Sequence, residues 1–115
     1  MDDRLQRALD VSNLIVTYNK QKELITEQFH QNLLYYYNGG QFTISTDLIN
    51  YCDLLLRQKK ESVILIADNN IPILVENLQI FKDKILENYI AITEKFYNDF
   101  SLLKSSRSVS KIINE

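Results

Sequence analysis

Glycine and proline are almost absent from this chain, and their scarcity constrains its fold more than any other feature of the sequence. The 115 residues include two glycines, which stand together at Gly39-Gly40, and one proline, Pro72. These two residue types most often end helices and form turns. The sequence therefore predicts a few long elements, with the main interruptions near Gly39 and Pro72.

The first third of the chain has the pattern of one long helix. Apolar side chains recur at alternating steps of three and four, which predicts a helix from about Arg4 to Asn38. Such a helix is roughly 50 Å long at 1.5 Å per residue. Leu5, Leu9 and Leu14 widen its apolar stripe. The stripe consists of Val11, Ile15, Tyr18, Ile25, Phe29 and Tyr36.

The segment LLYYYNGGQFTIS, residues 33–45, allows two structures. The apolar period runs into the three tyrosines without a break, and Gly39 then suits the left-handed cap of a helix. Asn38-Gly39 is also a strong signal for a type I′ hairpin turn, and tyrosine favours strands. We favour the helix that ends here, because the long period outweighs one dipeptide. The hairpin is the alternative.

Residues 41–75 predict a small β head that includes a short helix. Residues 41–45 alternate as a strand does, and Ser45 or Thr46 is a suitable N-cap for a helix over 47–60. The β-branched run 62–67 is typical of a buried strand, and the turn residues 68–70 connect it to a return strand over 71–75. We expect a β-hairpin here, with residues 41–45 as a possible third strand.

The helical period returns from Asn77 and predicts a second long helix that ends at about Lys104. Residues 105–115 are rich in serine and basic, and we expect them to form a flexible basic and apolar tail. The apolar stripe of this second helix consists of Phe81, Ile85, Tyr89, Ile92, Phe96 and Leu103.

Together these elements predict a mainly helical α+β fold. Residues 1–104 form one helical-hairpin domain, in which two long amphipathic helices pack as an antiparallel pair in the manner of a short coiled coil. A short helix and a small antiparallel β-hairpin lie between them in sequence, within about 41–75. The pair forms within one chain or between chains. Two helices cannot cover stripes this wide, so we expect the stripe residues given above to form the seam of a homo-oligomer.

The sequence offers no catalytic or metal-binding constellation. His30 and Cys52 are the single histidine and cysteine, so the ligand spacing of a zinc site is missing. Carboxylate pairs such as Glu23 and Glu27 flank the helical stripes, where we expect them to be solvated. We therefore expect neither an enzyme nor a cofactor.

The charge balance argues against broad electrostatic binding. The 13 basic and 15 acidic residues nearly cancel, so neither nucleic acid nor an anionic membrane is an expected partner. A single cysteine, an acidic beginning and short apolar runs predict a cytoplasmic protein with no membrane span. The tail is a candidate for binding a larger protein partner. Its candidate residues are Lys104, Arg107, Val109, Lys111, Ile112 and Ile113.

Four strings carry a resemblance: NGGQFTI, DLINYCDLL, SVILIADNNIPILVENL and, near the end, RSVSKII. In these strings the chain resembles small uncharacterised proteins of T-even-type bacteriophages of marine bacteria. The resemblance implies a role in the virion, in assembly or in host takeover, in the host cytoplasm or the virion, and it transfers no functional residue. The layout of two long helices joined through β elements is also similar to that of prefoldin-type chaperones. The helix over 47–60 departs from that pattern.

The sequence thus supports a non-enzymatic, self-associating interaction protein, with a phage accessory structural or assembly factor as the specific hypothesis. One alternative is a small regulator that binds nucleic acid or a polymerase through its basic tail. A second alternative is a prefoldin-like chaperone.

Overall fold

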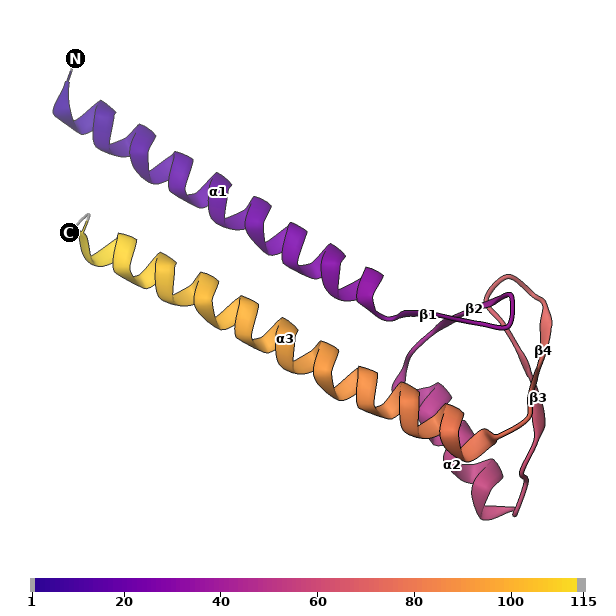
Figure 1. The fold of residues 1–115 in the computed structure, drawn as a ribbon. Helices are drawn as coiled ribbons and strands as arrows, with labels where there is room; N and C mark the ends of the chain where they lie inside the picture. Colours follow the sequence, from indigo (N-terminus) through magenta and orange to yellow (C-terminus); the bar gives the residue numbers. More distant parts are fainter. Residues whose placement is uncertain (1, 114–115) are drawn as a thin grey trace. The chain divides into compact units, whose positions relative to one another are not determined.

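The computed structural model describes residues 2–113, and side chains as far as residue 105. The mainly helical α+β fold is confirmed, and the two long helices, α1 and α3, pack against each other. By contact density the chain divides into unit 1, Met1–Gln28 with Lys95–Glu115, and unit 2, Phe29–Glu94. In chain order the elements are α1 (Asp3–Asn32), β1 (Leu34–Tyr37), β2 (Gly40–Thr43), α2 (Thr46–Arg57), β3 (Val63–Ile66), β4 (Pro72–Val75) and α3 (Leu78–Ile113) (Figure 1).

The favoured prediction for the tyrosine segment was wrong, because α1 ends at Asn32 and a hairpin follows. Strands β1 and β2 pair antiparallel, with Tyr37 opposite Gly40. Between them Asn38 and Gly39 have φ angles of 48° and 83°, and a type I′ turn requires positive φ at both central positions. The alternative that the Asn38-Gly39 signal offered is therefore the structure that forms.

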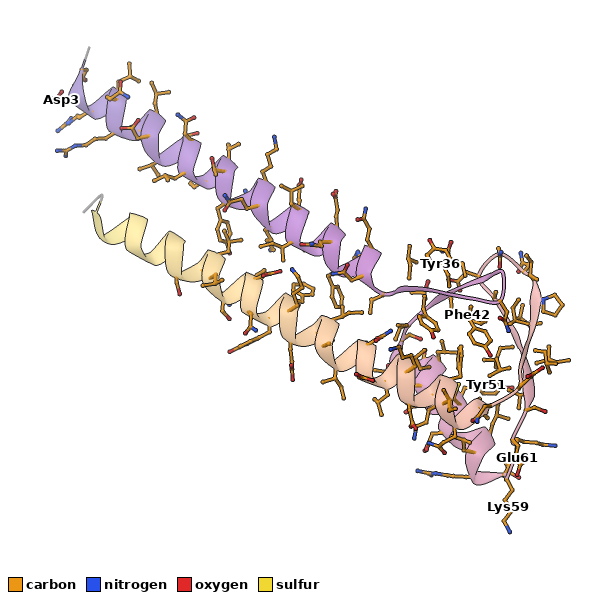
Figure 2. The ribbon with its side chains drawn as sticks, in the orientation of Figure 1. Asp3, Tyr36, Phe42, Tyr51, Lys59 and Glu61 are labelled. Carbon is orange, nitrogen blue, oxygen red and sulfur yellow. The ribbon has the colours of Figure 1, made fainter. Side chains whose placement is uncertain are left out.

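A contact distant in sequence explains why the tyrosines form a strand. Tyr35 and Tyr37 meet the ring of Phe81 edge-on, with centroids 5.9 and 5.3 Å apart, while Tyr36 between them is exposed (Figure 2). A strand places alternate residues on one face, whereas successive helical residues turn by about 100°. Only the strand therefore brings both tyrosines onto Phe81.

Replacing Gly39 by valine is expected to destabilise the protein by about 1–2 kcal/mol, because a β-branched residue strains at positive φ. A Cβ at this position meets no atom within 4 Å, so the effect comes from the backbone alone. Gly39→Asn is the matched control, since asparagine tolerates this conformation. Urea unfolding measures both variants. Equal stability of the valine and asparagine variants would contradict the turn.

Unit 2 contains two separate two-stranded sheets, so the prediction that residues 41–45 add a third strand to the later hairpin was wrong. Strand β2 pairs with β1 instead. The predicted hairpin over 62–75 is confirmed, with Ile64 opposite Leu74 in β3 and β4. The two hairpins meet where the Asp68 N–H donates a hydrogen bond of 2.7 Å to the Gln41 carbonyl.

Gly40 is the residue that allows this close approach. A Cβ on Gly40 would lie 2.6 Å from Ile73 Cγ1 and 2.9 Å from the Cβ of Ala67, both of them buried side chains. The two adjacent glycines are therefore required for different structural reasons. Gly39 supplies a positive φ, and Gly40 leaves room for the neighbouring hairpin.

Local signals set both ends of α2. The Ser45 Oγ accepts a hydrogen bond of 3.1 Å from the Leu48 N–H, which confirms the predicted N-cap. The helix ends at Arg57, three residues before the predicted end. Lys59 takes a positive φ of 61°, and the Lys60 N–H donates to the Leu55 carbonyl, as in a Schellman motif.

Helix α3 begins after Asn77, whose Oδ1 accepts a hydrogen bond of 3.1 Å from the Ile80 N–H. It continues to Ile113, nine residues beyond the predicted end at Lys104. No glycine or proline interrupts residues 105–113, so no local signal stops the helix there. The side chains of 106–115, which include most of the predicted binding tail, lie outside the described part.

The core of unit 2 combines α2, both hairpins and the first turns of α3. Partly buried side chains, including Phe29, Tyr89 and Ile92, pack around it. Its buried members are Leu33, Phe42, Ile44, Ile49, Cys52, Leu65, Ala67, Ile73, Val75, Leu78, Phe81 and Ile85.

Candidate functional site

Unit 1 holds an open pair of antiparallel helices, formed by α1 up to Gln28 and α3 from Lys95 (Figure 1). The Lys95 Nζ lies 3.5 Å from Gln28 Oε1 on the opposite helix and donates to Asp99 Oδ2 at 2.7 Å. A shallow hollow of about 370 Å³ lies between the helices. It is lined by Gln21, Leu24, Ile25, Asp99, Leu102 and Leu103. Leu24 and Leu102 are exposed there, so the pair leaves apolar surface uncovered.

Helix α1 contributes most of this uncovered surface, because none of its residues is buried. Each of its exposed large apolar side chains keeps more than 40% of its surface accessible to solvent. They are Leu5, Leu9, Val11, Leu14, Ile15, Val16 and Leu24.

Apart from Leu24, which lines the hollow, the exposed apolar side chains lie on two sides of α1. We call Val11, Leu14, Ile15, Tyr18 and Ile25 the inner stripe, since its members Tyr18 and Ile25 are half-buried. We call Leu5, Leu9 and Val16 the outer stripe. At about 100° per residue, the middle of the outer stripe lies roughly 150° around the helix from that of the inner stripe. One neighbouring helix cannot cover both stripes.

The residues predicted as an oligomer seam fall into three groups. Phe81 and Ile85 belong to the core of unit 2 within a single chain. Val11 and Ile15 are exposed on α1, and Tyr36 is exposed on β1. Leu103 is buried in unit 1. The remaining predicted seam residues are half-buried, and they are Tyr18, Ile25, Phe29, Tyr89, Ile92 and Phe96. The structure therefore does not bring the predicted seam together as one surface.

Of the predicted tail residues, Lys104 alone has a described side chain. Its Nζ lies 5.1 Å from the centre of the Phe100 ring, within the range of a cation–π interaction. Arg107, Val109, Lys111, Ile112 and Ile113 lie among the residues whose side chains are not described. The role predicted for the tail stays a prediction.

The prediction of a single apolar stripe assigned Leu5 and Leu9 to its flank and omitted Val16, whereas these three residues form the separate outer stripe. Val16 follows Leu9 by seven residues, which is two helical turns, and Leu9 follows Leu5 by four. A second apolar set at these spacings, out of phase with the first, was the available signal.

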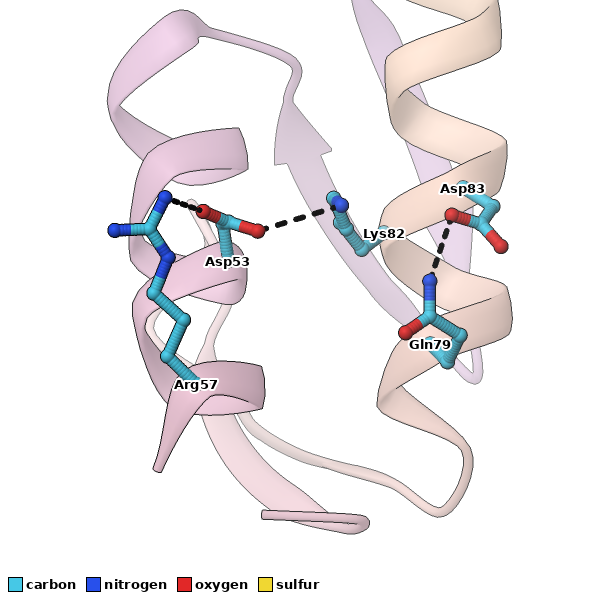
Figure 3. Close-up of polar contacts among 5 residues, drawn as sticks. All are labelled: Asp53, Arg57, Gln79, Lys82 and Asp83. Atoms are coloured by element: carbon cyan, nitrogen blue, oxygen red, sulfur yellow. Dashed lines mark hydrogen bonds and ion pairs between the residues drawn. The ribbon is translucent and has the colours of Figure 1, made fainter. Parts of the chain in front are cut away.

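Polar contacts in unit 2 lie on the surfaces of α2 and α3 and between them (Figure 3). Asp53 lies between two cations, with Arg57 Nη2 at 3.0 Å and Lys82 Nζ at 3.4 Å. Gln79 Nε2 donates to Asp83 Oδ1 at 2.9 Å on the surface of α3. An exposed pair such as Arg57 with Asp53 contributes about 0–1 kcal/mol. Of the three contacts, the one between Asp53 and Lys82 joins the two helices.

Cys52 is fully buried in this unit. Burial raises the pKa of its thiol from 9.0 to about 11, and the nearby Lys82 ammonium acts weakly in the opposite direction. The thiolate is the nucleophilic form of cysteine. At pH 8 a buried, protonated Cys52 is therefore unreactive.

The pKa of Cys52 predicts a pH-dependent loss of stability. The unfolded thiol ionises near pH 9.0 and the folded thiol near pH 11. Between these values the unfolded state releases a proton that the folded state keeps, so the free energy of unfolding falls by about 2 kcal/mol across the interval. Urea unfolding at pH 8 to 11 measures the fall. Cys52→Ala is the control, and it should lack this component. A parallel dependence in both proteins would contradict the assignment.

Other candidates for chemistry are isolated. His30 is exposed, and its ring lies 5.6 Å from that of Phe29. Within the described residues no group of three or more His, Cys, Asp or Glu side chains is arranged to hold a metal ion. In the same part of the chain, no helix has both the length and the apolar character needed to cross a membrane.

Comparison of the chain with known protein families, curated proteins and solved structures gives no match. The surface chemistry of the two units is therefore the basis for assigning a function.

Proposed function

We propose that this chain is a non-enzymatic interaction protein that self-associates through unit 1. One observation carries the proposal. Leu5, Leu9 and Val16 are 52, 43 and 62% exposed on a side of α1 that its half-buried residues do not share. A helix that is apolar on two sides requires two neighbours. Helix α3 of the same chain is one neighbour, and a helix of a second copy is the other.

The energy available from such a contact is substantial. Complete burial of a leucine or valine side chain contributes about 1.5–3 kcal/mol. Association costs several kcal/mol in lost translational and rotational freedom. Burial of the outer stripe offsets this cost, and burial of the exposed inner-stripe residues on the other side of α1 adds to the gain. Two copies bring together four helices, the number in the simplest bundle with a closed apolar core.

A self-associating helical unit joined to a β head suits a scaffold. Unit 1 would hold the copies together, and unit 2 would present its surface to a larger protein. The resemblance to small phage proteins makes an accessory structural or assembly factor the specific role that we assign.

The double substitution of Leu9 and Val16 by glutamine tests the proposal. Both side chains are exposed, so unit 2 should keep its unfolding transition. The dissociation constant of the oligomer, measured by sedimentation equilibrium, should rise at least tenfold. Tyr97→Gln is the matched control, because it removes an exposed apolar side chain from α3 in the same unit. If the double variant associates as tightly as the unaltered chain, the outer stripe is not the interface.

A prefoldin-like chaperone is the second candidate, and the two hairpins favour it. They lie in sequence between two long helices, whose unit 1 portions expose apolar side chains. Such side chains would bind unfolded polypeptide. The assay is suppression of aggregation of a chemically unfolded client protein. A chain that suppresses aggregation and loses that ability in the Leu9 and Val16 variant supports this candidate.

A further inference from the structure

The outward face of the β3–β4 hairpin is apolar throughout. Leu65, Ile73 and Val75 point into the core, and the alternate residues point out. Of these, Ile64, Ile66 and Leu74 are 64, 66 and 52% exposed. The pairing of Ile64 with Leu74 and of Ile66 with Pro72 brings the four side chains together on one side. We call these four residues the β3–β4 face.

An apolar outward face is unusual for a two-stranded antiparallel sheet, whose solvent side is normally polar. Residues 61–76 also include no lysine or arginine. Both strands have only one partner strand, so each has a free edge within the described residues. A free edge suits an added strand, whereas an exposed apolar face also suits a helix that carries apolar side chains on one side.

The charges around the β3–β4 face indicate the partner. Glu61 and Glu76 lie at one end of the hairpin and Asp68 at the other, and all three are exposed. Figure 2 labels Glu61 beside Lys59. Lys59 and Lys60 precede the first end. Two such faces packed against each other would bring acidic residues close to acidic residues, which disfavours a symmetric contact. An apolar segment that carries cations and no acids fits better.

The chain itself contains such a segment. Residues 100–114 include no aspartate or glutamate, and they carry three cations, Lys104, Arg107 and Lys111. Val109, Ile112 and Ile113 supply the apolar side chains. We propose that the β3–β4 face of one copy binds the C-terminal segment, residues 104–113, of a second copy.

This contact differs in kind from the association through the outer stripe. Each copy contributes a face to one neighbour and a segment to another, so the contact is head-to-tail and extends into rings or filaments. It uses neither Leu5, Leu9 nor Val16. The head-to-tail contact can therefore be tested independently of the proposed function.

Two variants of the full chain test the proposal by solution mass. The face variant carries Ile64→Ser and Leu74→Ser, and both positions are exposed, so the fold should persist. The segment variant carries Lys104→Glu, Arg107→Glu and Lys111→Glu. Far-ultraviolet circular dichroism checks the fold of each. Each variant alone should lose the largest species of the unaltered chain, with a dissociation constant at least tenfold higher.

Mixing the two variants provides the decisive result. The face variant keeps an intact segment, and the segment variant keeps an intact face, so the mixture should recover one contact per pair of chains. Because the contact is partly ionic, 1 M salt should weaken it. A face variant with unaltered mass would overturn the proposal. So would a mixture that shows no recovery, because the intact face and the intact segment would then fail to bind each other. A segment variant with unaltered mass would also overturn the proposal, since that outcome indicates a symmetric contact between faces.

The outer-stripe variant separates the two proposals. In Leu9→Gln with Val16→Gln, the head-to-tail contact should persist and keep the mass above that of one chain. If that variant is unaltered while the face and segment variants dissociate, the proposed function fails and the head-to-tail contact stands.

Discussion

Ile85→Asp is expected to unfold unit 2. Ile85 is fully buried in the cluster formed by α2, α3 and the hairpins. An unpaired carboxylate in such a place costs several kcal/mol, in addition to the lost apolar contacts. The whole free energy of unfolding of a domain is typically about 5–15 kcal/mol. Near-ultraviolet circular dichroism of the tyrosines should therefore lose its native signal at 25 °C.

Ile90→Asp is the matched control for this prediction, because Ile90 lies on the same helix and is about half exposed. Its free energy of unfolding should change by less than about 1 kcal/mol, as is usual for surface positions. A cooperative, native-like unfolding transition in Ile85→Asp would mean that α3 does not face the core as described.

Phe81→Ala is expected to destabilise unit 2 by about 3–5 kcal/mol, the usual range for removing a buried phenylalanine. Phe81 meets three aromatic rings edge-on, with centroids 5.9 Å away for Tyr35, 5.3 Å for Tyr37 and 5.5 Å for Phe42. Such pairs add about 0.5–1.5 kcal/mol each beyond the area that they bury. Urea unfolding measures the total.

The same substitution should loosen β1 more than α2, because two of the three rings belong to β1. Hydrogen exchange at the amides of 34–37 should therefore accelerate before exchange in 46–57 does. Tyr97→Ala is the control, since it removes an exposed aromatic ring from the same helix. A loss below about 1 kcal/mol in Phe81→Ala would contradict the aromatic core.

Local chemistry made several elements predictable from sequence. The hydroxyl of Ser45 and the amide of Asn77 each accept a backbone hydrogen bond at the start of a helix. The residues over 68–70 favour a turn wherever they occur. These signals act within a few residues, so α2, the β3–β4 hairpin and the start of α3 followed from the sequence.

The end of α1 depends on an interaction that no local pattern contains. Phe81 lies more than forty residues after Tyr35 and Tyr37 in the sequence. Contacts with its ring stabilise the strand conformation of these two tyrosines. The Asn38-Gly39 signal was correct, and the helical period that outweighed it continued by coincidence through Tyr36. Tertiary contact outweighed local pattern here.

The candidate surfaces were harder to predict than the fold. A continuous apolar run such as 63–67 is typical of a strand buried on both faces, yet Ile64 and Ile66 are exposed. On α1, counting one stripe located Val11 and Ile15 but not the outer stripe. Sequence periodicity shows which residues share a side of an element, and only the packed structure shows which side remains uncovered.

The molar mass of the unaltered chain in solution tests the central claim most directly. Light scattering over a dilution series at micromolar concentrations is the measurement. Self-association predicts a multiple of the 13.5 kDa chain mass that falls toward 13.5 kDa on dilution. A mass of 13.5 kDa at every concentration would contradict the claim, because the outer stripe would then remain exposed to solvent in the functional protein.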